Sequence, residues 1–199
     1  LADVDKQKHM VLQNLDVVRN FGITTDNTDV DFFIPEEAKM FVRRIFEENN
    51  LSKSNNSPSP PFAKGGAGGV MDKVVHIHPT SRWLFKCWKD EYMAEIISWL
   101  LDNGVKVVVT SAPDNKEMEK AKRILSLVLE KHTEVKNIRS YEDKNFSTSQ
   151  PLNFLTSQTS DSKLIDLCGK TSIKQLAAVS DASDLFIGVD SAPMHIAAA

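Results

Sequence analysis

The clearest strand in the chain is Val105-Lys106-Val107-Val108-Val109-Thr110, which is β-branched almost throughout. An amphipathic helix is predicted on each side of it, over residues 89–101 and over residues 114–131, where apolar side chains repeat at helical spacing. Further short strands are predicted over residues 74–78, 164–167 and 185–189, and a further helix over residues 172–180. Repeated β–α units of this kind predict an α/β fold with a parallel sheet and right-handed crossovers, covered by helices.

The N-terminal part of the chain is organised differently. Residues 9–21 carry apolar groups mostly at helical spacing, and Gly22 follows as a stop signal. Residues 31–34 are predicted to form a short strand. Pro35 then begins a second helix that runs to about Asn49, because proline and the acidic residues after it suit the first turn.

Residues 53–72 are dominated by Ser, Asn, Pro and Gly, and they predict a flexible linker or an inserted loop. The glycines do not predict a phosphate site, because they precede a strand, whereas the phosphate fingerprint follows a strand and opens a helix. We therefore divide the chain into residues 1–52, the linker 53–72 and residues 73–199.

Composition and charge exclude several classes of protein. The 199 residues carry 24 Lys and Arg against 27 Asp and Glu, and the net charge of -3 argues against nonspecific binding to nucleic acid. The sequence has neither an apolar run of membrane-spanning length nor a signal peptide. Two distant cysteines, Cys87 and Cys168, predict a protein of a reducing compartment. The chain begins at Leu1 and stops within residues 194–199, where a helix is just beginning, so we expect a piece of a longer polypeptide.

Polar residues follow the predicted strands, at the sheet edge where ligands bind in such folds. After the first strand come Thr80, Ser81, Arg82 and Lys86, which could hold an anion; an ordinary loop with capping hydroxyls is an equal alternative. After the second strand, Asn115 could contact a ribose, although helix capping by Asp114 or Asn115 is the stronger interpretation. After the third strand, Gly169 could allow a turn or a close approach by a ligand, and Ser172 could cap a helix.

The loop after the fourth strand is Asp190-Ser191-Ala192-Pro193-Met194-His195. Free N–H groups around Ser191 and Ala192 would suit a phosphate, and Asp190 would then face a sugar hydroxyl or a cation. The alternative is that Asp190 caps the helix and His195 packs. His76 and His78 share one strand face, but no third ligand lies nearby, so no metal site is predicted; Cys87 is interpreted as a packing thiol.

Together these loops resemble a known family. The motifs that carry the resemblance are His78-Pro79-Thr80-Ser81-Arg82, Phe85-Lys86-Cys87-Trp88, Val108-Val109-Thr110-Ser111-Ala112-Pro113-Asp114, Leu167-Cys168-Gly169-Lys170-Thr171 and residues 185–199. In this order they are similar to the ADP-heptose:lipopolysaccharide heptosyltransferases of glycosyltransferase family 9, most of all to the type III branch. The resemblance spans most of the chain outside residues 53–72 and 132–162.

The resemblance implies a GT-B fold, in which residues 73–199 form a Rossmann-like C-terminal donor-binding domain and residues 1–52 end the N-terminal acceptor domain. The implied reaction transfers L-glycero-D-manno-heptose from ADP-heptose to the inner core of lipopolysaccharide, with inversion and without a metal or cofactor. The family's general base, an Asp near the N-terminus of the full protein, lies outside these residues. The isolated chain is therefore expected not to turn over.

The resemblance also assigns roles to residues. Lys86 and Asp190 are the expected catalytic residues: Lys86 neutralises the departing diphosphate, and Asp190 meets the heptose hydroxyls. The expected donor-binding residues are Thr80, Ser81, Lys86, Asn115, Thr171, Asp190, Ser191, Ala192 and His195.

The implied partners are ADP-heptose and the lipopolysaccharide core, in the cytoplasm, with peripheral association at the inner membrane. Nucleic acid is not an expected partner. Two alternatives stay open: a GT-B transferase that uses another nucleotide-sugar, and an inactive nucleotide-binding remnant.

Overall fold

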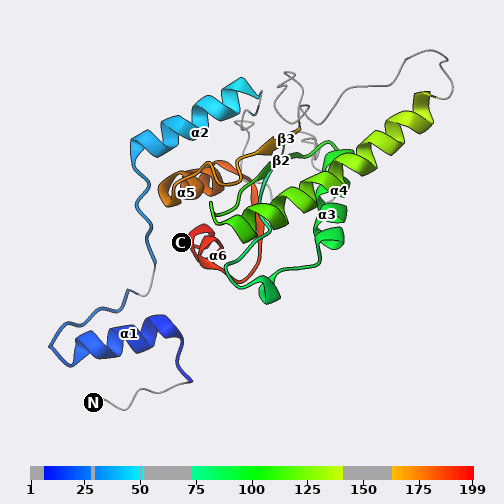
Figure 1. Ribbon diagram of the computed structural model, residues 1–199. Coiled ribbons are helices and arrows are strands. Elements are labelled where there is room, and N and C mark those ends of the chain that lie inside the picture. The colour runs from blue at the N-terminus through cyan, green and yellow to red at the C-terminus, as the bar shows by residue number, and fades with distance from the viewer. Residues whose placement is uncertain (1–6, 28–29, 50, 52–72, 141–162) are drawn as a thin grey trace, which may run out of the picture. The chain divides into compact units, whose positions relative to one another are not determined.

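The computed structural model describes residues 7–27, 30–49, 51, 73–140 and 163–199 (Figure 1). The chain divides into two compact units. The first comprises residues 1–32 together with Ala199, and the second comprises residues 33–198.

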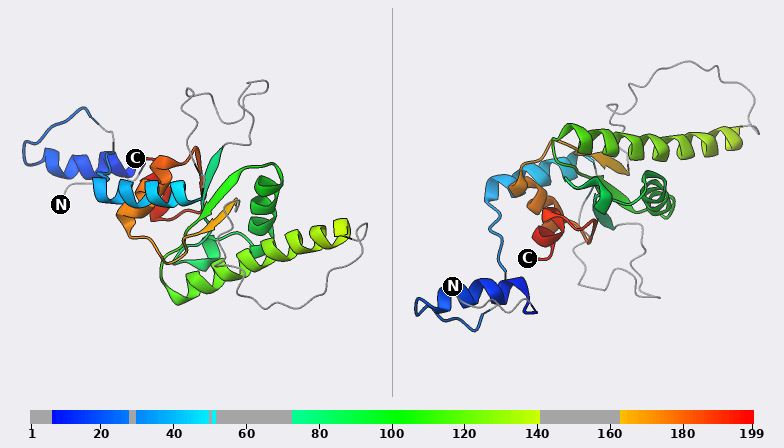
Figure 2. Two further views of the ribbon diagram at one scale, coloured as in Figure 1. Left: turned by 90° about the horizontal axis from the view of Figure 1, so that it is seen from above. Right: turned by 60° about the horizontal axis from the view of Figure 1, so that its bottom comes forward.

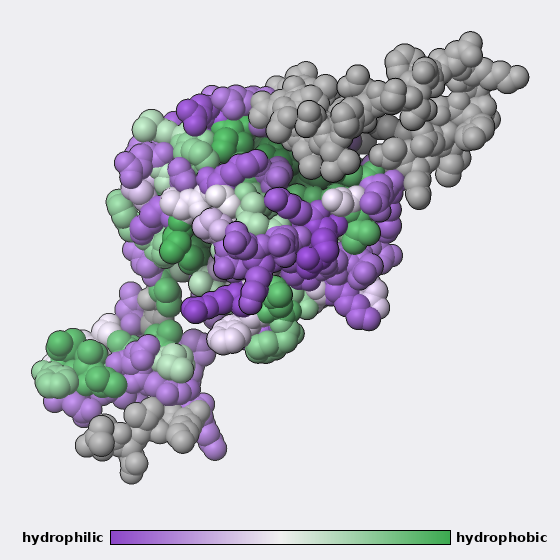
Figure 3. All heavy atoms as spheres, in the orientation of Figure 1, coloured by the Kyte–Doolittle hydropathy of each residue, from purple (hydrophilic) through white to green (hydrophobic). Residues whose placement is uncertain are grey.

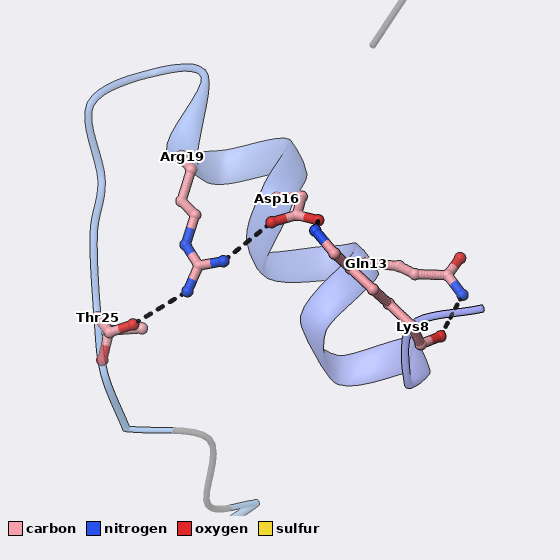
Figure 4. Close-up of polar contacts among 5 residues, drawn as sticks. All are labelled: Lys8, Gln13, Asp16, Arg19 and Thr25. Carbon is pink, nitrogen blue, oxygen red and sulfur yellow. Dashed lines mark hydrogen bonds and ion pairs between the residues drawn. The ribbon is translucent and has the colours of Figure 1, made fainter. Parts of the chain in front are cut away.

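The first unit is built around helix α1 (Met10–Arg19), which buries none of its residues. Polar contacts hold it instead (Figure 4): the Asp16 carboxylate accepts hydrogen bonds from Lys8 Nζ at 2.7 Å and from Arg19 Nη1 at 2.9 Å. These two bonds lower the pKa of Asp16. Arg19 also donates to the carbonyl of Thr25 at 3.5 Å, and Gln13 donates to the carbonyl of Lys8 at 2.7 Å. The helix predicted over residues 9–21 is therefore present, stabilised locally rather than by a core.

The second unit contains a sheet of four parallel strands in the order β3-β2-β1-β4. The strands are β1 (Val74–His78), β2 (Lys106–Val109), β3 (Leu164–Asp166) and β4 (Leu185–Gly188). β1 is central and every one of its residues is buried, as expected for a parallel strand covered on both faces. The predicted parallel α/β sheet is confirmed.

Helices cover both faces of the sheet (Figures 1 and 2). α3 (Asp90–Asp102) and α4 (Asn115–Ser140) pack together on one face, and α2 (Glu36–Glu48) and α5 (Ile173–Ala182) pack together on the other. The side chains of β1 alternate between the two resulting cores: Val75 and Ile77 meet the α3–α4 side, and Val74 meets the α2–α5 side. The outward face of α4 over residues 115–132 is hydrophilic, as the purple surface in the centre of Figure 3 shows.

Local signals explain where the helices begin. Ser172 accepts a hydrogen bond from the backbone N–H of Gln175, whose side chain returns one to the N–H of Ser172, so α5 begins in a complete capping box. α2 follows Pro35 and has Glu36 and Glu37 in its first turn, as predicted. After β4, the short helix α6 (Ala192–Ala197) contains Pro193 in its first turn.

Two predicted elements differ in the structure. Residues 31–34 form no strand: Phe33 is exposed, and Lys174 of α5 donates to its carbonyl and lies over its ring, so these groups are held without a neighbouring strand. The helix predicted to end near residue 131 continues to Ser140, since residues 132–140 contain neither Gly nor Pro to stop it. The predicted linker, residues 53–72, and residues 141–162 lie outside the described residues.

The predicted boundary at residue 52 stays a prediction. In the structure, α2 shares a buried cluster with the sheet and α5, through Ala38, Val42 and Phe46. No helix in the described ranges is long and apolar enough to cross a membrane.

The packing of α2 leads to a stability prediction. Phe46 is 7% exposed, and its replacement by Ala removes a ring from the core beside β1 and α5, so we expect Phe46→Ala to lower the free energy of unfolding by about 3–5 kcal/mol. Met40 lies on the same helix and is 53% exposed, so Met40→Ala should change the free energy of unfolding by less than about 0.5 kcal/mol. Urea unfolding measures both values. Equal effects of the two changes would contradict the packing of α2.

Candidate functional site

A cleft of about 570 Å³ lies at the carboxyl ends of the strands. The loops after all four strands line it, with residues of α4, α5 and α6. This volume is within the range of small-molecule sites, and the position is the one where α/β folds bind ligands. The cleft therefore gathers the loops that the sequence singled out.

The loop after β1 supplies two buried hydroxyls, Thr80 and Ser81. Thr80 Oγ1 donates to Glu117 Oε2 of α4 at 2.7 Å, and Ser81 Oγ accepts from the N–H of Trp83 at 3.3 Å. Glu117 is 6% exposed and lines the cleft. Sequence reasoning missed it; the available signal was its position three residues after Asp114, where a helix start often carries Glu.

Lys86 and Asp190, which both line the cleft, form an ion pair. Lys86 belongs to the short 3-10 helix η2 (Leu84–Lys86), and its Nζ lies 2.6 Å from Asp190 Oδ2 in the loop after β4. The hydrogen bond from Lys86, and then its charge, lower the pKa of Asp190. An ammonium has three N–H donors, so Lys86 can hold Asp190 and still donate to a bound anion.

Of the other residues predicted after β4, Ser191, Ala192 and His195 all line the cleft. His195 Nε2 lies 4.0 Å from Asp190 Oδ1. The Ser191 hydroxyl donates to the carbonyl of Val189 at 3.2 Å and makes no capping bond to α6. Asp190 is paired with Lys86, and the residue at the N-cap of α6 is Ser191. The alternative in which Asp190 caps this helix is therefore not observed.

Thr171 lines the cleft from the loop after β3. Its Oγ1 is buried and has no hydrogen-bond partner among the described residues. The preceding Gly169 has a φ of 69°, and a Cβ atom there would meet Met118 Sδ at 2.7 Å. The turn that the sequence predicted at Gly169 is confirmed, and only glycine fits it.

Asn115 does not line the cleft. It is the exposed first residue of α4, and Asp114 caps this helix: Asp114 Oδ1 accepts from the N–H groups of Lys116 at 3.0 Å and Glu117 at 3.4 Å. The capping interpretation of this loop is therefore confirmed for Asp114. The ribose contact by Asn115 finds no support in this geometry.

His76 and His78 on β1 are joined through one hydroxyl. Thr110 Oγ1 lies 2.7 Å from His76 Nε2 and 2.8 Å from His78 Nδ1, and His76 Nδ1 lies 2.9 Å from Ser180 Oγ of α5. Burial lowers the pKa of His76 to about 3, with a smaller contribution from His78, and lowers that of His78 to about 4. Both rings are therefore neutral at pH 7. His78 also lines the cleft.

Neither the histidine pair His76 and His78 nor the cysteines Cys87 and Cys168 have the environment of a metal site or a reactive thiol. Both ring nitrogens of His76 are engaged by hydroxyls, and within the described ranges no three His, Cys, Asp or Glu side chains gather to hold a metal ion. Burial raises the pKa of both Cys87 and Cys168, so neither is an activated thiolate.

The sequence matches the model of a family described as "Glycosyltransferase family 9 (heptosyltransferase)" over residues 2–136 and 153–199. The chain belongs to this family. It is 30% identical over 191 residues to lipopolysaccharide heptosyltransferase 3 of Escherichia coli strain K12, a match that covers 96% of this chain and 41% of that protein. It is 31% identical over 131 residues to a second Escherichia coli protein of the same name, covering 66% of this chain and 29% of the relative.

Among solved structures, the family 9 glycosyltransferase from Veillonella parvula DSM 2008 is similar, with a TM-score of 0.63 and 18% identity. The similarity covers 98% of this chain and 42% of that one. It confirms the fold expected from the sequence, that of a GT-B glycosyltransferase. This family 9 chain thus spans less than half of the length of the proteins it is compared with, from 29% to 42%.

The two buried histidines predict a pH dependence of stability. Below about pH 6.5 each ring binds a proton in the unfolded chain, but the folded chain binds one only near pH 4 or 3. The unfolded state therefore holds more protons in this window, and the free energy of unfolding should fall by up to about 1.4 kcal/mol per pH unit for each ring as the pH falls.

Urea unfolding between about pH 7 and about pH 5 measures this slope. The His76→Gln variant should have a smaller slope than the wild type, whereas a change at the exposed His9 should leave it unaltered. An unchanged slope in His76→Gln would contradict the prediction.

Proposed function

We propose that this family 9 chain is the donor-binding part of a heptosyltransferase. The donor is ADP-heptose, and the complete enzyme transfers L-glycero-D-manno-heptose to the inner core of lipopolysaccharide with inversion and without a metal. Family membership and the names of the Escherichia coli relatives support the reaction class. The working compartment proposed is the cytoplasm, with the acceptor at the inner membrane.

The observation that carries the proposal is the ion pair between Lys86 and Asp190 at the cleft. A nucleotide-sugar joins an anionic diphosphate to a ring of hydroxyls, and the pair offers a cation and a carboxylate side by side. Lys86 donates to the diphosphate and stabilises the negative charge that develops on the departing ADP. Asp190 accepts hydrogen bonds from the sugar hydroxyls. In these roles both are catalytic residues.

The remaining cleft residues would complete the donor site. Arg82 lies in the cleft wall beside Ser81 and adds a second cation for the diphosphate. The unpartnered Thr171 hydroxyl is suited to a polar group of the nucleotide. Ser191, Ala192 and His195 form the wall next to Asp190. The proposal gives Thr80 a supporting role, because its hydroxyl is already donated to Glu117.

Two other functions would use the same cleft. A transferase for a different nucleotide-sugar would keep Lys86 in its role and differ at the sugar. A nucleotide-binding remnant without activity would bind ADP with no contribution from the sugar. Titration with several ligands separates the three.

The test is calorimetric titration of the chain with ADP-heptose, ADP and UDP-glucose. We expect ADP-heptose to bind more tightly than ADP, and UDP-glucose to bind most weakly. Lys86→Ala should weaken both adenine ligands about tenfold or more, because a charge-assisted hydrogen bond is lost. Asp190→Ala should weaken the binding of ADP-heptose but not the binding of ADP. Lys89→Ala is the matched control, since Lys89 is an exposed cation near Lys86 that contacts the Tyr92 ring.

Each contrary outcome identifies an alternative. Equal binding of ADP-heptose and UDP-glucose would favour another donor. Equal binding of ADP-heptose and ADP would favour a remnant. Loss of affinity in Lys89→Ala as large as in Lys86→Ala would show a diffuse charge effect and contradict the assigned role of Lys86.

A further inference from the structure

Two buried histidines, a threonine and a serine form a continuous hydrogen-bonded chain that ends at the cleft. It runs from Ser180 of α5 through His76 of β1 and Thr110, just after β2, to His78 at the end of β1. Its three donor–acceptor distances are 2.7–2.9 Å. Both rings and Thr110 are at most 3% exposed, Ser180 at the far end is half-buried, and the chain reaches the cleft at His78.

The single proton of the Thr110 hydroxyl couples the two rings. Thr110 Oγ1 contacts one nitrogen of each ring, and with one O–H it donates to one ring and accepts from the other. A neutral imidazole has one N–H and one bare nitrogen, so a ring that accepts a hydrogen bond at one nitrogen donates from the other. The direction of donation is therefore the same at both rings. The chain therefore has two arrangements, one with all donors pointing toward the cleft and one with all pointing away.

Ser180 selects between the two arrangements. Among the residues that the structure describes, its hydroxyl has one hydrogen-bond partner, His76 Nδ1. Ser180 is half-buried, and a hydroxyl donor without a partner costs more than an unused acceptor site, so we assign the Ser180 proton to the bond with His76 Nδ1. His76 then carries its proton on Nε2 and donates to Thr110, which donates to His78 Nδ1. His78 is left with its proton on Nε2.

We propose that this relay fixes His78 as a neutral N–H donor whose Nε2 proton is held ready for a phosphate oxygen of the ligand. His78 Nε2 makes no hydrogen bond within the described ranges, in contrast to Nδ1, and His78 lines the cleft. Ionised phosphate oxygens accept hydrogen bonds and donate none. The other tautomer of His78, with its proton on Nδ1 and a lone pair on Nε2, would therefore repel an anion in the cleft. Ser180, His76 and Thr110 act as positioning residues. The ligand class rests on the function proposed above, whereas the direction of the relay does not.

The direction can be measured without a ligand. Long-range 1H–15N correlation spectra of the imidazole rings distinguish a proton on Nε2 from one on Nδ1. At neutral pH we expect both His76 and His78 as neutral Nε2–H rings. Observation of an Nδ1–H ring or a charged ring at His78 would overturn the proposal, whether or not the chain binds a nucleotide.

A pair of substitutions at Thr110 then tests the consequence. Thr110→Val removes the hydroxyl with little change of shape, and it should allow Nδ1–H to appear at His78 and weaken ADP binding about tenfold. Thr110→Ser keeps the hydroxyl and should retain both the wild-type tautomer and the wild-type affinity. A purely structural role for Thr110 would leave the tautomer of His78 unchanged in Thr110→Val. If Thr110→Val does not fold, Ser180→Ala, which removes the group that sets the direction, takes its place with the same expected change at His78.

The ligand class is tested by comparing ADP with adenosine. His78→Phe should weaken ADP about tenfold and leave adenosine within about twofold, because only ADP carries phosphate oxygens. Equal losses for both ligands would overturn the phosphate contact and place His78 at the nucleoside instead. Failure of the wild type to bind ADP, with both rings in the Nε2–H form, would reject the proposed function and the phosphate contact but not the direction of the relay.

Discussion

A parallel strand pair cannot be closed by a tight turn, because the chain must cross back before the next strand starts. In this protein that constraint places the loops after β1, β2, β3 and β4 at one edge of the sheet. Lys86 and Asp190 are far apart in the sequence, yet they meet there because β1 and β4 are neighbours in register. The cleft, its charges and the end of the histidine relay all depend on this single arrangement of strands.

The same sheet also has to accommodate polar groups in its centre. β1 is covered on both faces, and two of its five side chains are imidazoles. Burying them without partners would be costly, and the hydroxyls of Thr110 and Ser180 offset that cost by contacting both nitrogens of His76 and Nδ1 of His78. Phe186 on β4 adds an edge-on ring contact to His76, with centroids 5.0 Å apart. The centre of the sheet is thus held by directional polar contacts as well as by hydrophobic packing.

Much of this architecture follows from local sequence signals. β-branched runs predict β1 and β2, and Ser172 predicts the start of α5, because the forces involved act within a few residues. The loops of the cleft could be predicted too, since their place follows from strand polarity. The contact of Thr80 with Glu117 and the sharing of Thr110 by two rings could not, because they depend on how α4 and β2 pack beside β1. Residues 31–34 show the reverse case: their aromatic side chains favour a strand, but none of the strands in the described ranges pairs with them, and Lys174 of α5 contacts Phe33 instead.

The ion pair in the cleft has a consequence for selectivity. Lys86 already has a counter-ion, so an anion that approaches it must share the ammonium with Asp190 or displace it. A free inorganic anion gains little from such an exchange, because it brings repulsion from the carboxylate along with attraction to the amine. A ligand that joins an anion to neighbouring hydroxyls satisfies both partners at once. Because Lys86 and Asp190 neutralise each other, we expect the cleft to favour ligands that carry both kinds of group in one molecule.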